Sequence, residues 1–244
     1  MKNSCQVNIN LNFIIFNKQK KILMLKNTCF WSFFLLASSV WGLLFFSGCT
    51  GTESRKHQNQ ENKDWTPLFD GKSLEGWEIT NFGTQGPVQV SQGSIVIGMG
   101  DGCSGIHLKD TFPVINYEIE LQAKKVSGND FFCGMTFPVG ETFCSFICGG
   151  WGGPVVGLST IDGNDAAHNE TQVLKKFEHD QWYSIHLKVT DTKIEAWIDS
   201  EQLVDFKTEG RKLSIRPEVN LSKPFGICTW MTTGEIKDIY LKRL

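Results

Sequence analysis

The sequence predicts an all-β fold over residues 64–244, an antiparallel sandwich of two sheets. Apolar and polar residues alternate in several segments, as they do on half-buried strands. Gly, Pro, Asn and Asp separate these segments at short intervals, which is typical of turns between strands. No long segment has the 3.6-residue period of a helix, and the only helical candidate is a short turn near 173–177. Many short strands with little helix favour a sandwich.

The residues before this domain predict an export signal. Residues 27–52 carry no charge, and within them 30–46 are almost wholly apolar; Lys26 precedes this run and Ser47-Gly48-Cys49 follows it. A basic start, a short apolar run and small residues at a cleavage site are typical of a secretory signal. The cysteine after Ser-Gly resembles a bacterial lipobox, which would make Cys49 the lipid-modified first residue of the mature chain. An uncleaved membrane anchor is the alternative.

The boundaries of the N-terminal segments follow from this interpretation. Met24 begins a signal of ordinary length, so residues 1–23 are interpreted as a mis-called start and 24–48 as a lipoprotein signal peptide. Residues 49–63 are polar, without a large apolar residue after Cys49, and predict a disordered tether. We therefore expect a membrane-anchored lipoprotein of the cell envelope, facing the periplasm or the cell surface.

The stretch 65–77 predicts a tight turn held against the core. Asp70-Gly71 suits such a turn, because Gly accepts a positive φ and an Asp side chain accepts hydrogen bonds from the local backbone. Apolar residues on both sides supply the surface that would hold it: Trp65, Leu68, Phe69, Leu74 and Trp77.

Two pairs of segments predict hairpins. Residues 182–190 and 193–199 alternate in polarity and are joined by Asp191-Thr192. Residues 131–137 and 142–147 flank the turn 138–141. If residues 137 and 142 pair, Cys133 faces Phe146 and Met135 faces Cys144 on an apolar, core-facing side.

Residues 148–154 hold four glycines around Trp151. A glycine costs about 0.5–1 kcal/mol relative to alanine in a regular element, so these residues do not serve strand stability. One interpretation is that a ligand approaches the backbone at Gly150 and Gly152 while Trp151 stacks on a sugar ring. The other is a bulged strand that turns a corner of the sandwich.

The next segment, residues 162–171, is a polar loop. Carboxylate and amide oxygens at this density could bind a hard divalent cation. The carboxylates and the imidazole could instead supply a general base and acid. A surface loop whose Asp and Asn residues form local turns is the third interpretation.

Composition limits the partners. All 26 acidic residues lie beyond Cys49, with 19 of the 24 Lys and Arg, so the mature chain would carry a formal charge near −7. This charge argues against nucleic acid as a partner. The domain's cysteines lack the Cys-x-x-Cys spacing of a zinc site and are interpreted as small buried hydrophobic residues, with a disulfide as the alternative. They are Cys103, Cys133, Cys144, Cys148 and Cys228.

The opening phrase Leu-Phe-Asp-Gly-Lys at 68–72, with Gly-Trp at 76–77, resembles the bacterial 3-keto-disaccharide hydrolase domain family. The closing segment 234–241 is also similar to that family. The resemblance covers residues 64–244 and implies a jelly roll of the concanavalin A or laminin G type.

Members of that family act on sugars whose C3 hydroxyl has been oxidised to a ketone. A base removes the C2 proton, an acid or a metal stabilises the enolate, the glycosidic oxygen leaves, and water adds. Typical members carry an Asn-Ser-Gly…Arg strand and a later strand with Glu, Gln and Asp. The matching stretches here, 129–137 and 143–148, lack the Arg and the carboxylate-amide set, so those roles cannot be assigned by position.

Two functional interpretations remain, and carbohydrate is the expected partner in both. In the enzyme interpretation, His168 or Glu170 is the base, Asp165 and Asp162 orient it or hold a divalent cation, and Trp151 stacks on the sugar. The further substrate contacts expected there are Gly150, Gly152 and Asn164. In the binding interpretation, the same groove is a non-catalytic carbohydrate-binding module at the cell surface. A purely structural envelope lipoprotein is a third possibility.

Overall fold

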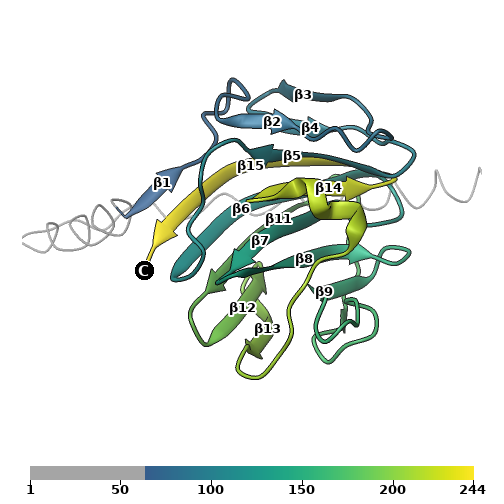
Figure 1. The fold of residues 1–244 in the computed structure, drawn as a ribbon. Coiled ribbons are helices and arrows are strands. Elements are labelled where there is room, and N and C mark those ends of the chain that lie inside the picture. Colours follow the sequence, from purple (N-terminus) through teal and green to yellow (C-terminus); the bar gives the residue numbers. More distant parts are fainter. Residues whose placement is uncertain (1–63) are drawn as a thin grey trace, which may run out of the picture. The chain divides into compact units, whose positions relative to one another are not determined.

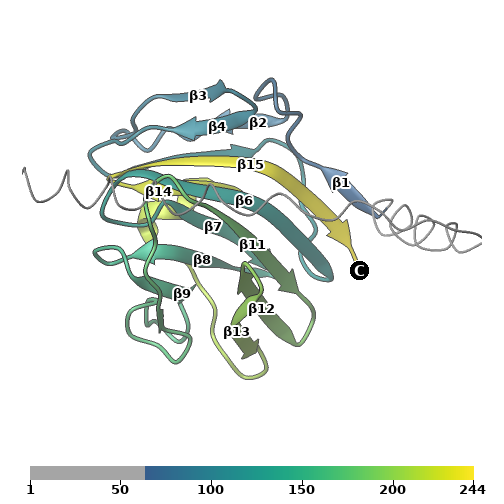
Figure 2. The same cartoon turned by 180° about the vertical axis from the view of Figure 1, so that it is seen from behind.

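The structure is a computed structural model that describes residues 64–244; the predictions for 1–63, including lipidation of Cys49, lie outside the described residues. Two antiparallel sheets pack against each other around one apolar core (Figure 1, Figure 2). The predicted two-sheet sandwich is confirmed. Within residues 64–244 there is no helix with the length and apolar character needed to cross a membrane.

The first sheet, sheet A, has the strand order β13-β12-β11-β6-β15-β4-β3, and β1 pairs with β15 beside this path. Its strands are β1 (Trp65–Pro67), β3 (Val88–Ser91), β4 (Ser94–Ile97), β6 (Tyr117–Gly128), β11 (Trp182–Val189), β12 (Lys193–Ile198), β13 (Glu201–Lys207) and β15 (Thr232–Arg243).

The second sheet, sheet B, has the order β10-β9-β8-β7-β14-β5-β2. Its strands are β2 (Trp77–Ile79), β5 (Cys103–Leu108), β7 (Cys133–Val139), β8 (Thr142–Gly150), β9 (Val155–Ser159), β10 (Val173–Leu174) and β14 (Gly226–Trp230). A short 3-10 helix, η1 (Pro217–Ser222), lies in front of the sheets in Figure 1 and behind them in Figure 2.

The predicted turn at 65–77 forms as expected. The backbone N–H groups of Lys72 and Ser73 donate to Oδ1 of Asp70, both at 2.8 Å. Trp77 is buried, and its indole N–H donates to the carbonyl oxygen of Leu68 at 2.7 Å. The turn is therefore held to the core by the second tryptophan of the opening phrase.

The core is built from the alternating segments. β6 and β11 pair antiparallel, with Leu121 opposite Ile185, and every second side chain along β11 is buried. β11 continues into β12 with Ile185 opposite Ile198, which confirms the predicted hairpin. The alternation of apolar and polar residues along these strands therefore fixes which face of sheet A turns toward the core.

The hairpin of β7 and β8 forms, but its predicted register is wrong by two residues. Val139 pairs with Thr142, so the turn contains only residues 140–141, with Gly140 at a φ of 60°. Cys133 therefore lies opposite Cys148, and the other predicted pairs shift by the same amount. A shift of two residues leaves every side chain on its predicted face, so the apolar side still points into the core.

The helical turn predicted near 173–177 is also wrong. Residues 173–174 form β10, which pairs with β9, and the N–H of Lys175 donates to the carbonyl oxygen of Pro154 at 2.8 Å. The helical segment is instead η1, which has Pro217 in its first turn. Proline is tolerated there because an N–H in the first turn has no partner within the helix.

The cysteines of the domain behave as small apolar residues. All five cysteines within residues 64–244 are free and buried. Burial raises the pKa of the Cys144 thiol to about 12, so this thiol stays protonated. The prediction of buried thiols is confirmed over the described part of the chain.

Candidate functional site

Sheet B is covered on part of its outer face as well as on its core face. Two segments, residues 160–172 and 208–222, cross this outer face, and we call them the cover. They pair with each other: the N–H of Thr160 donates to the carbonyl oxygen of Ser214 at 2.7 Å, and that of Asp162 to Lys212 at 2.8 Å. Two small apolar clusters join the cover to the sheet; Val219 packs in one and Ala166 in the other.

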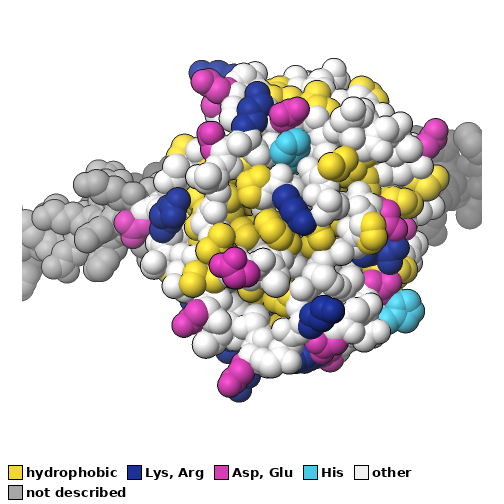
Figure 3. Space-filling model, viewed as in Figure 1, with side chains coloured by type: hydrophobic (Ala, Val, Ile, Leu, Met, Phe, Trp, Pro, Cys, Tyr) yellow, Lys and Arg dark blue, Asp and Glu magenta, His cyan; other side chains and the backbone are white. Residues whose placement is uncertain are grey.

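A hollow of about 210 Å³ remains between the cover and sheet B. Its charged lining residues are Asp130, Arg216 and Glu218, and its tryptophans are Trp151 and Trp230. Figure 3 shows this side of the molecule, where apolar side chains reach the surface among basic and acidic ones. The volume is below the roughly 300–1,000 Å³ of pockets for drug-sized ligands, so the hollow has room for a smaller molecule or for part of a larger one.

Trp151 reaches the hollow because the glycines around it permit a left-handed turn. Trp151 has a φ of 49°, and Gly149, Gly152 and Gly153 have φ values of 83°, 85° and 112°. The register between β8 and β9 shifts between Cys148 and Gly150, so the predicted bulge is confirmed. Trp151 also lines the hollow, while its stacking on a sugar stays a prediction.

The two glycines predicted to contact substrate have different surroundings. A Cβ at Gly150 would lie 2.9 Å from Cγ2 of Ile147, so glycine is required there by packing inside the protein. A Cβ at Gly152 would meet nothing within 4 Å. The structure thus explains Gly150 without a ligand.

Asp130 fixes the turn that carries Trp151. Its Oδ1 accepts a hydrogen bond from the N–H of Phe131 at 2.8 Å, and its Oδ2 accepts one from Gly152 at 3.2 Å. Lys125 lies close by on β6; burial lowers the pKa of Lys125, and the charge of Asp130 opposes that shift. Both oxygens of Asp130 are therefore engaged by the backbone.

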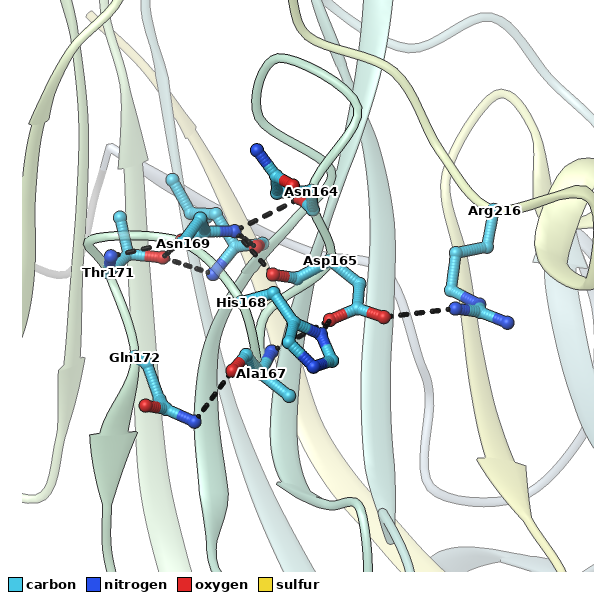
Figure 4. Close-up of polar contacts among 9 residues, drawn as sticks. Asn164, Asp165, Ala167, His168, Asn169, Thr171, Gln172 and Arg216 are labelled. Atoms are coloured by element: carbon cyan, nitrogen blue, oxygen red, sulfur yellow. Dashed lines mark hydrogen bonds and ion pairs between the residues drawn. The ribbon is translucent and has the colours of Figure 1, made fainter.

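The polar loop is ordered mainly by Asn169. Its Nδ2 donates to the carbonyl oxygens of Leu158 and Asp165, both at 2.8 Å, and its Oδ1 accepts from the N–H of Thr171 at 2.9 Å (Figure 4). The carbonyl oxygen of Asn164 is a third, longer acceptor at 3.2 Å. Much of the loop's polarity is thus used to hold its own backbone, as the local-turn interpretation expects.

Asp165 lies between His168 and Arg216 (Figure 4). Its Oδ1 is 2.6 Å from Nδ1 of His168, and its Oδ2 accepts from Nη1 of Arg216 at 3.2 Å. The other end of the guanidinium, Nη2, donates to Oε1 of Glu218 at 2.8 Å. The side chain of His168 is 70% exposed and does not line the hollow.

Glu170 and Asp162 are both bound by Arg211. Arg211 donates from Nε to Oδ2 of Asp162 at 2.7 Å and forms an ion pair with Glu170. The hydrogen bond from Arg211 holds the pKa of Glu170 below its usual range. The pKa of Asp162 is lowered first by the N–H of Lys212 and then by Arg211. Neither carboxylate lines the hollow.

The hollow therefore contains one of the predicted site residues and several that the sequence did not reveal. Trp151 is in its lining; Asp165, His168, Glu170, Asp162 and Asn164 lie in the cover, outside that lining. Arg216 and Glu218 were missed because no local motif marks them. They reach the hollow only because residues 212–214 pair with 160–162, some fifty positions earlier.

The charge state of Glu218 is set by its neighbour. The hydrogen bond from Arg216 holds the pKa of Glu218 below its usual range, against an upward effect of burial. Glu218 is therefore ionised at neutral pH and can accept a proton. The guanidinium beside it can stabilise negative charge that develops on a bound molecule.

The predicted divalent cation finds no matching ligand set. Within residues 64–244 no group of three or more His, Cys, Asp or Glu side chains is arranged to hold a metal ion. The loop carboxylates meet arginines instead, with Asp162 and Glu170 on Arg211 and Asp165 on Arg216. These residues do not fit a cation site.

Comparison with known proteins gives the fold and the family. The Crh5 transglycosylase in complex with NAG has a TM-score of 0.53 at 12% identity, covering 74% of this chain and 84% of that chain. A protein with a galectin-like fold from Bacillus subtilis has a TM-score of 0.52 at 10% identity, covering 73% and 94%. A β-1,3-1,4-glucanase (lichenase) from a mouse hindgut metagenome has a TM-score of 0.50 at 10% identity, covering 74% and 98%. At these identities the likeness concerns the fold alone, and it confirms the predicted jelly-roll type of sandwich.

No curated protein matches the sequence. Residues 64–242 match the family described as the 3-keto-alpha-glucoside-1,2-lyase-like domain, the same stretch in which the opening and closing phrases resemble it. The match spans nearly all of the described domain. The chain belongs to the 3-keto-α-glucoside-1,2-lyase-like domain family.

Proposed function

We propose that the domain binds one ring of a 3-keto-α-glucoside in the hollow and cleaves its glycosidic bond by elimination followed by hydration. Family membership supports the substrate class. Trp151 and Trp230 offer apolar ring surfaces for the sugar. The observation that carries the proposal is the contact of Arg216 with Glu218, at 2.8 Å, in the lining of this hollow.

In the proposed reaction Glu218 is the base. Its carboxylate takes the C2 proton, and the electron pair of that C–H bond forms an enolate whose oxygen is the former C3 ketone. Arg216 stabilises the enolate oxygen. Collapse of the enolate breaks the C1–O bond, and the leaving oxygen takes the proton from Glu218. Water then adds its oxygen to C1 and a proton to C2, so the net result is hydrolysis.

Glu218 is a better candidate base than Asp130. Both oxygens of Asp130 accept backbone hydrogen bonds, from Phe131 and Gly152. Glu218 meets Arg216 through Oε1, which leaves its second oxygen for substrate. A base must reach the proton that it removes, so an unoccupied carboxylate oxygen in the lining favours Glu218.

The polar loop has a supporting part in this proposal. Asp165 accepts a hydrogen bond from Arg216 and so helps to position the guanidinium. A catalytic role for His168 or Glu170 stays a prediction. His168 has the carboxylate partner expected of a base, in Asp165, but its side chain lies mostly in solvent.

The test is turnover of a panel of 3-keto-α-glucosides, with the parent glucosides as controls. Release of free sugar by the wild-type protein is expected, and Glu218→Gln should abolish it. Glu170→Gln is the matched control, because this carboxylate also meets an arginine but lies outside the hollow. Loss of turnover in Glu170→Gln or His168→Ala, with Glu218→Gln active, would instead place the chemistry in the polar loop.

A non-catalytic carbohydrate-binding module is the second candidate. It is supported by the strands 129–137 and 143–148, which lack the Arg and the carboxylate-amide set typical of the family. In that case the wild-type protein binds a glucoside of the panel without releasing sugar. Trp151→Ala would weaken that binding. Glu218→Gln would not change turnover, because the wild-type protein would have none.

We also propose that the protein is a lipoprotein of the cell envelope, anchored to the membrane by a lipid on Cys49. The apolar run at 30–46 followed by Ser47-Gly48-Cys49 supports this. Labelling cells with a fatty-acid probe should mark the wild-type protein, and Cys49→Ala should remove the label and release the protein from membranes. A peptide upstream of Met24 in mass spectra would show that translation starts before Met24.

A further inference from the structure

Three neighbouring strands of sheet B carry hydroxyl side chains in register, and two of these residues line the hollow. Thr136 on β7 lies opposite Ser145 on β8, and Ser145 lies opposite Ser159 on β9. All three residues are at least 98% buried. Ser145 and Ser159 are part of the lining of the hollow. The strand register therefore sets the three hydroxyl residues side by side on one face of sheet B.

Ser159 differs from the other two in having no partner. Oγ1 of Thr136 and Oγ of Ser145 are 2.9 Å apart and satisfy each other. Oγ of Ser159 is buried and makes no hydrogen bond within residues 64–244. A hydroxyl has one donor and two acceptor sites, and buried polar groups without any partner are rare in folded proteins. An unpaired hydroxyl in the lining of a hollow points to a ligand atom as its partner.

We propose that Ser159 is a substrate-binding residue whose hydroxyl bonds to the sugar oxygen that enters deepest into the hollow. This inference rests on the proposed function, since it names a contact made by the same substrate.

The chemistry of these strands also limits which part of the sugar can meet Ser159. The residue opposite Ser159 in the sheet is Ser145, which also lines the hollow and carries no charge, while the charged lining residues Asp130, Arg216 and Glu218 stand outside these two strands. A carboxylate or phosphate held at the hydroxyls of Ser159 and Ser145 would lose water without gaining an opposite charge from them, which is costly. We therefore expect the group that meets Ser159 to be a neutral oxygen, a hydroxyl or the ketone, of a sugar that is uncharged at this edge.

Thr229 on β14 provides a matched control. Its Oγ1 is also buried without a hydrogen-bond partner in the described residues. Thr229 adjoins Trp230 in the strand, so its side chain points to the opposite face, away from the hollow. Removing this hydroxyl removes an equally buried, equally unpaired group that no ligand can reach.

The experiment is calorimetric titration of methyl 3-keto-α-glucoside, and of the parent methyl α-glucoside, into Glu218→Gln, which lacks the proposed base and so leaves the sugar uncleaved. The same titrations are made into Glu218→Gln with Ser159→Ala added and into Glu218→Gln with Thr229→Val added. Ser159→Ala should weaken binding about tenfold, and Thr229→Val should change it less than about twofold. Neither variant should lower the midpoint of thermal unfolding, because neither hydroxyl makes a bond in the free protein.

The outcomes separate this inference from the function on which it rests. Equal binding with and without Ser159→Ala would refute the role of Ser159 and leave the proposed function standing. Equal weakening in Ser159→Ala and Thr229→Val would also refute it, because the effect would then come from packing. If Glu218→Gln binds neither glucoside and wild type cleaves neither, the proposed function is wrong and the inference fails with it.

Discussion

Replacing Arg216 with methionine should slow catalysis far more than it destabilises the fold. Methionine keeps the apolar stem of the side chain and removes the guanidinium. The change breaks the contacts with Asp165 at 3.2 Å and with Glu218 at 2.8 Å. It leaves Glu218 in place as a base but without a positive group beside the developing enolate.

The structure gives the size of each effect. The side chains of Arg216 and Glu218 are 44% and 39% exposed, so solvent screens the two ion pairs and each contributes roughly 0.2–1 kcal/mol to stability. A unit charge about 4 Å from the enolate oxygen is worth up to about 4 kcal/mol at an effective dielectric of about 20. Exposure to solvent reduces this energy. We therefore expect kcat to fall by about 10²–10³-fold, as it does when one oxyanion donor is removed from an enzyme.

The assay is kcat on methyl 3-keto-α-glucoside at saturation, together with urea unfolding of each variant. Arg211→Met is the control, because Arg211 also bridges two carboxylates, Asp162 and Glu170, but lies outside the lining of the hollow. Arg216→Met should lose about 10²-fold in kcat or more, and Arg211→Met should keep it. The reasoning is wrong if Arg216→Met retains most of its activity, or if Arg211→Met loses as much.

The same variant should change the pH dependence. Arg216 holds the pKa of Glu218 below its usual range, so the base stays ionised to lower pH. Without Arg216 this pKa rises, and the acid limb of the kcat profile should move to higher pH. A carboxyl with a lowered folded-state pKa adds stability above its unfolded pKa and loses it as pH falls through the folded value. In Arg216→Met this acid-dependent loss of stability should be smaller.

Three further outcomes are expected. Tyr117→Phe removes the buried bond from its hydroxyl to the carbonyl oxygen of Pro138, at 2.7 Å, and should lower the free energy of unfolding by about 1–3 kcal/mol without changing the urea m-value. Trp151→Ala should weaken glucoside binding about tenfold, as expected for loss of an aromatic contact, whereas Trp197→Ala on sheet A should not; titration calorimetry distinguishes them. Hydrogen bonds from Ser73 and Lys72 lower the pKa of Asp70, so this carboxylate stabilises the fold above the usual Asp pKa and loses that effect as pH falls. Asp70→Ala should therefore lower the unfolding midpoint at neutral pH and change it less at acid pH.

The period of apolar residues was enough to predict the sandwich, because it reports directly which side chains face the core. It predicted the hairpin of β11 and β12 in full. It could not fix the turn between β7 and β8, since a register shift of two residues preserves both faces and thus leaves the apolar pattern unchanged. The turn is set by Gly140 and its positive φ, which is a local backbone preference rather than a pattern.

The hollow was less predictable than the fold for a physical reason. Trp151 could be recognised because glycines around a tryptophan are unusual in a strand. Arg216 and Glu218 stand in a segment without periodicity, and only the pairing of two distant segments of the cover brings them to the hollow. The composition of the polar loop suggested a site. In the structure Asn169 instead bonds to the backbone of the loop, and Asp162 accepts a hydrogen bond from Arg211.

The order of the strands has a consequence for how the chain can be made. β14 lies between β7 and β5, and β15 lies between β6 and β4, although both are the last strands to be synthesised. Until residues 226–243 emerge, each sheet exists as separate halves with unpaired inner edges, which invite pairing with other chains. Joining them requires contacts between residues far apart in sequence, so folding should be slow and should complete only after release of the C-terminus. A chain that ends before Gly226 would lack an interior strand in each of the two sheets.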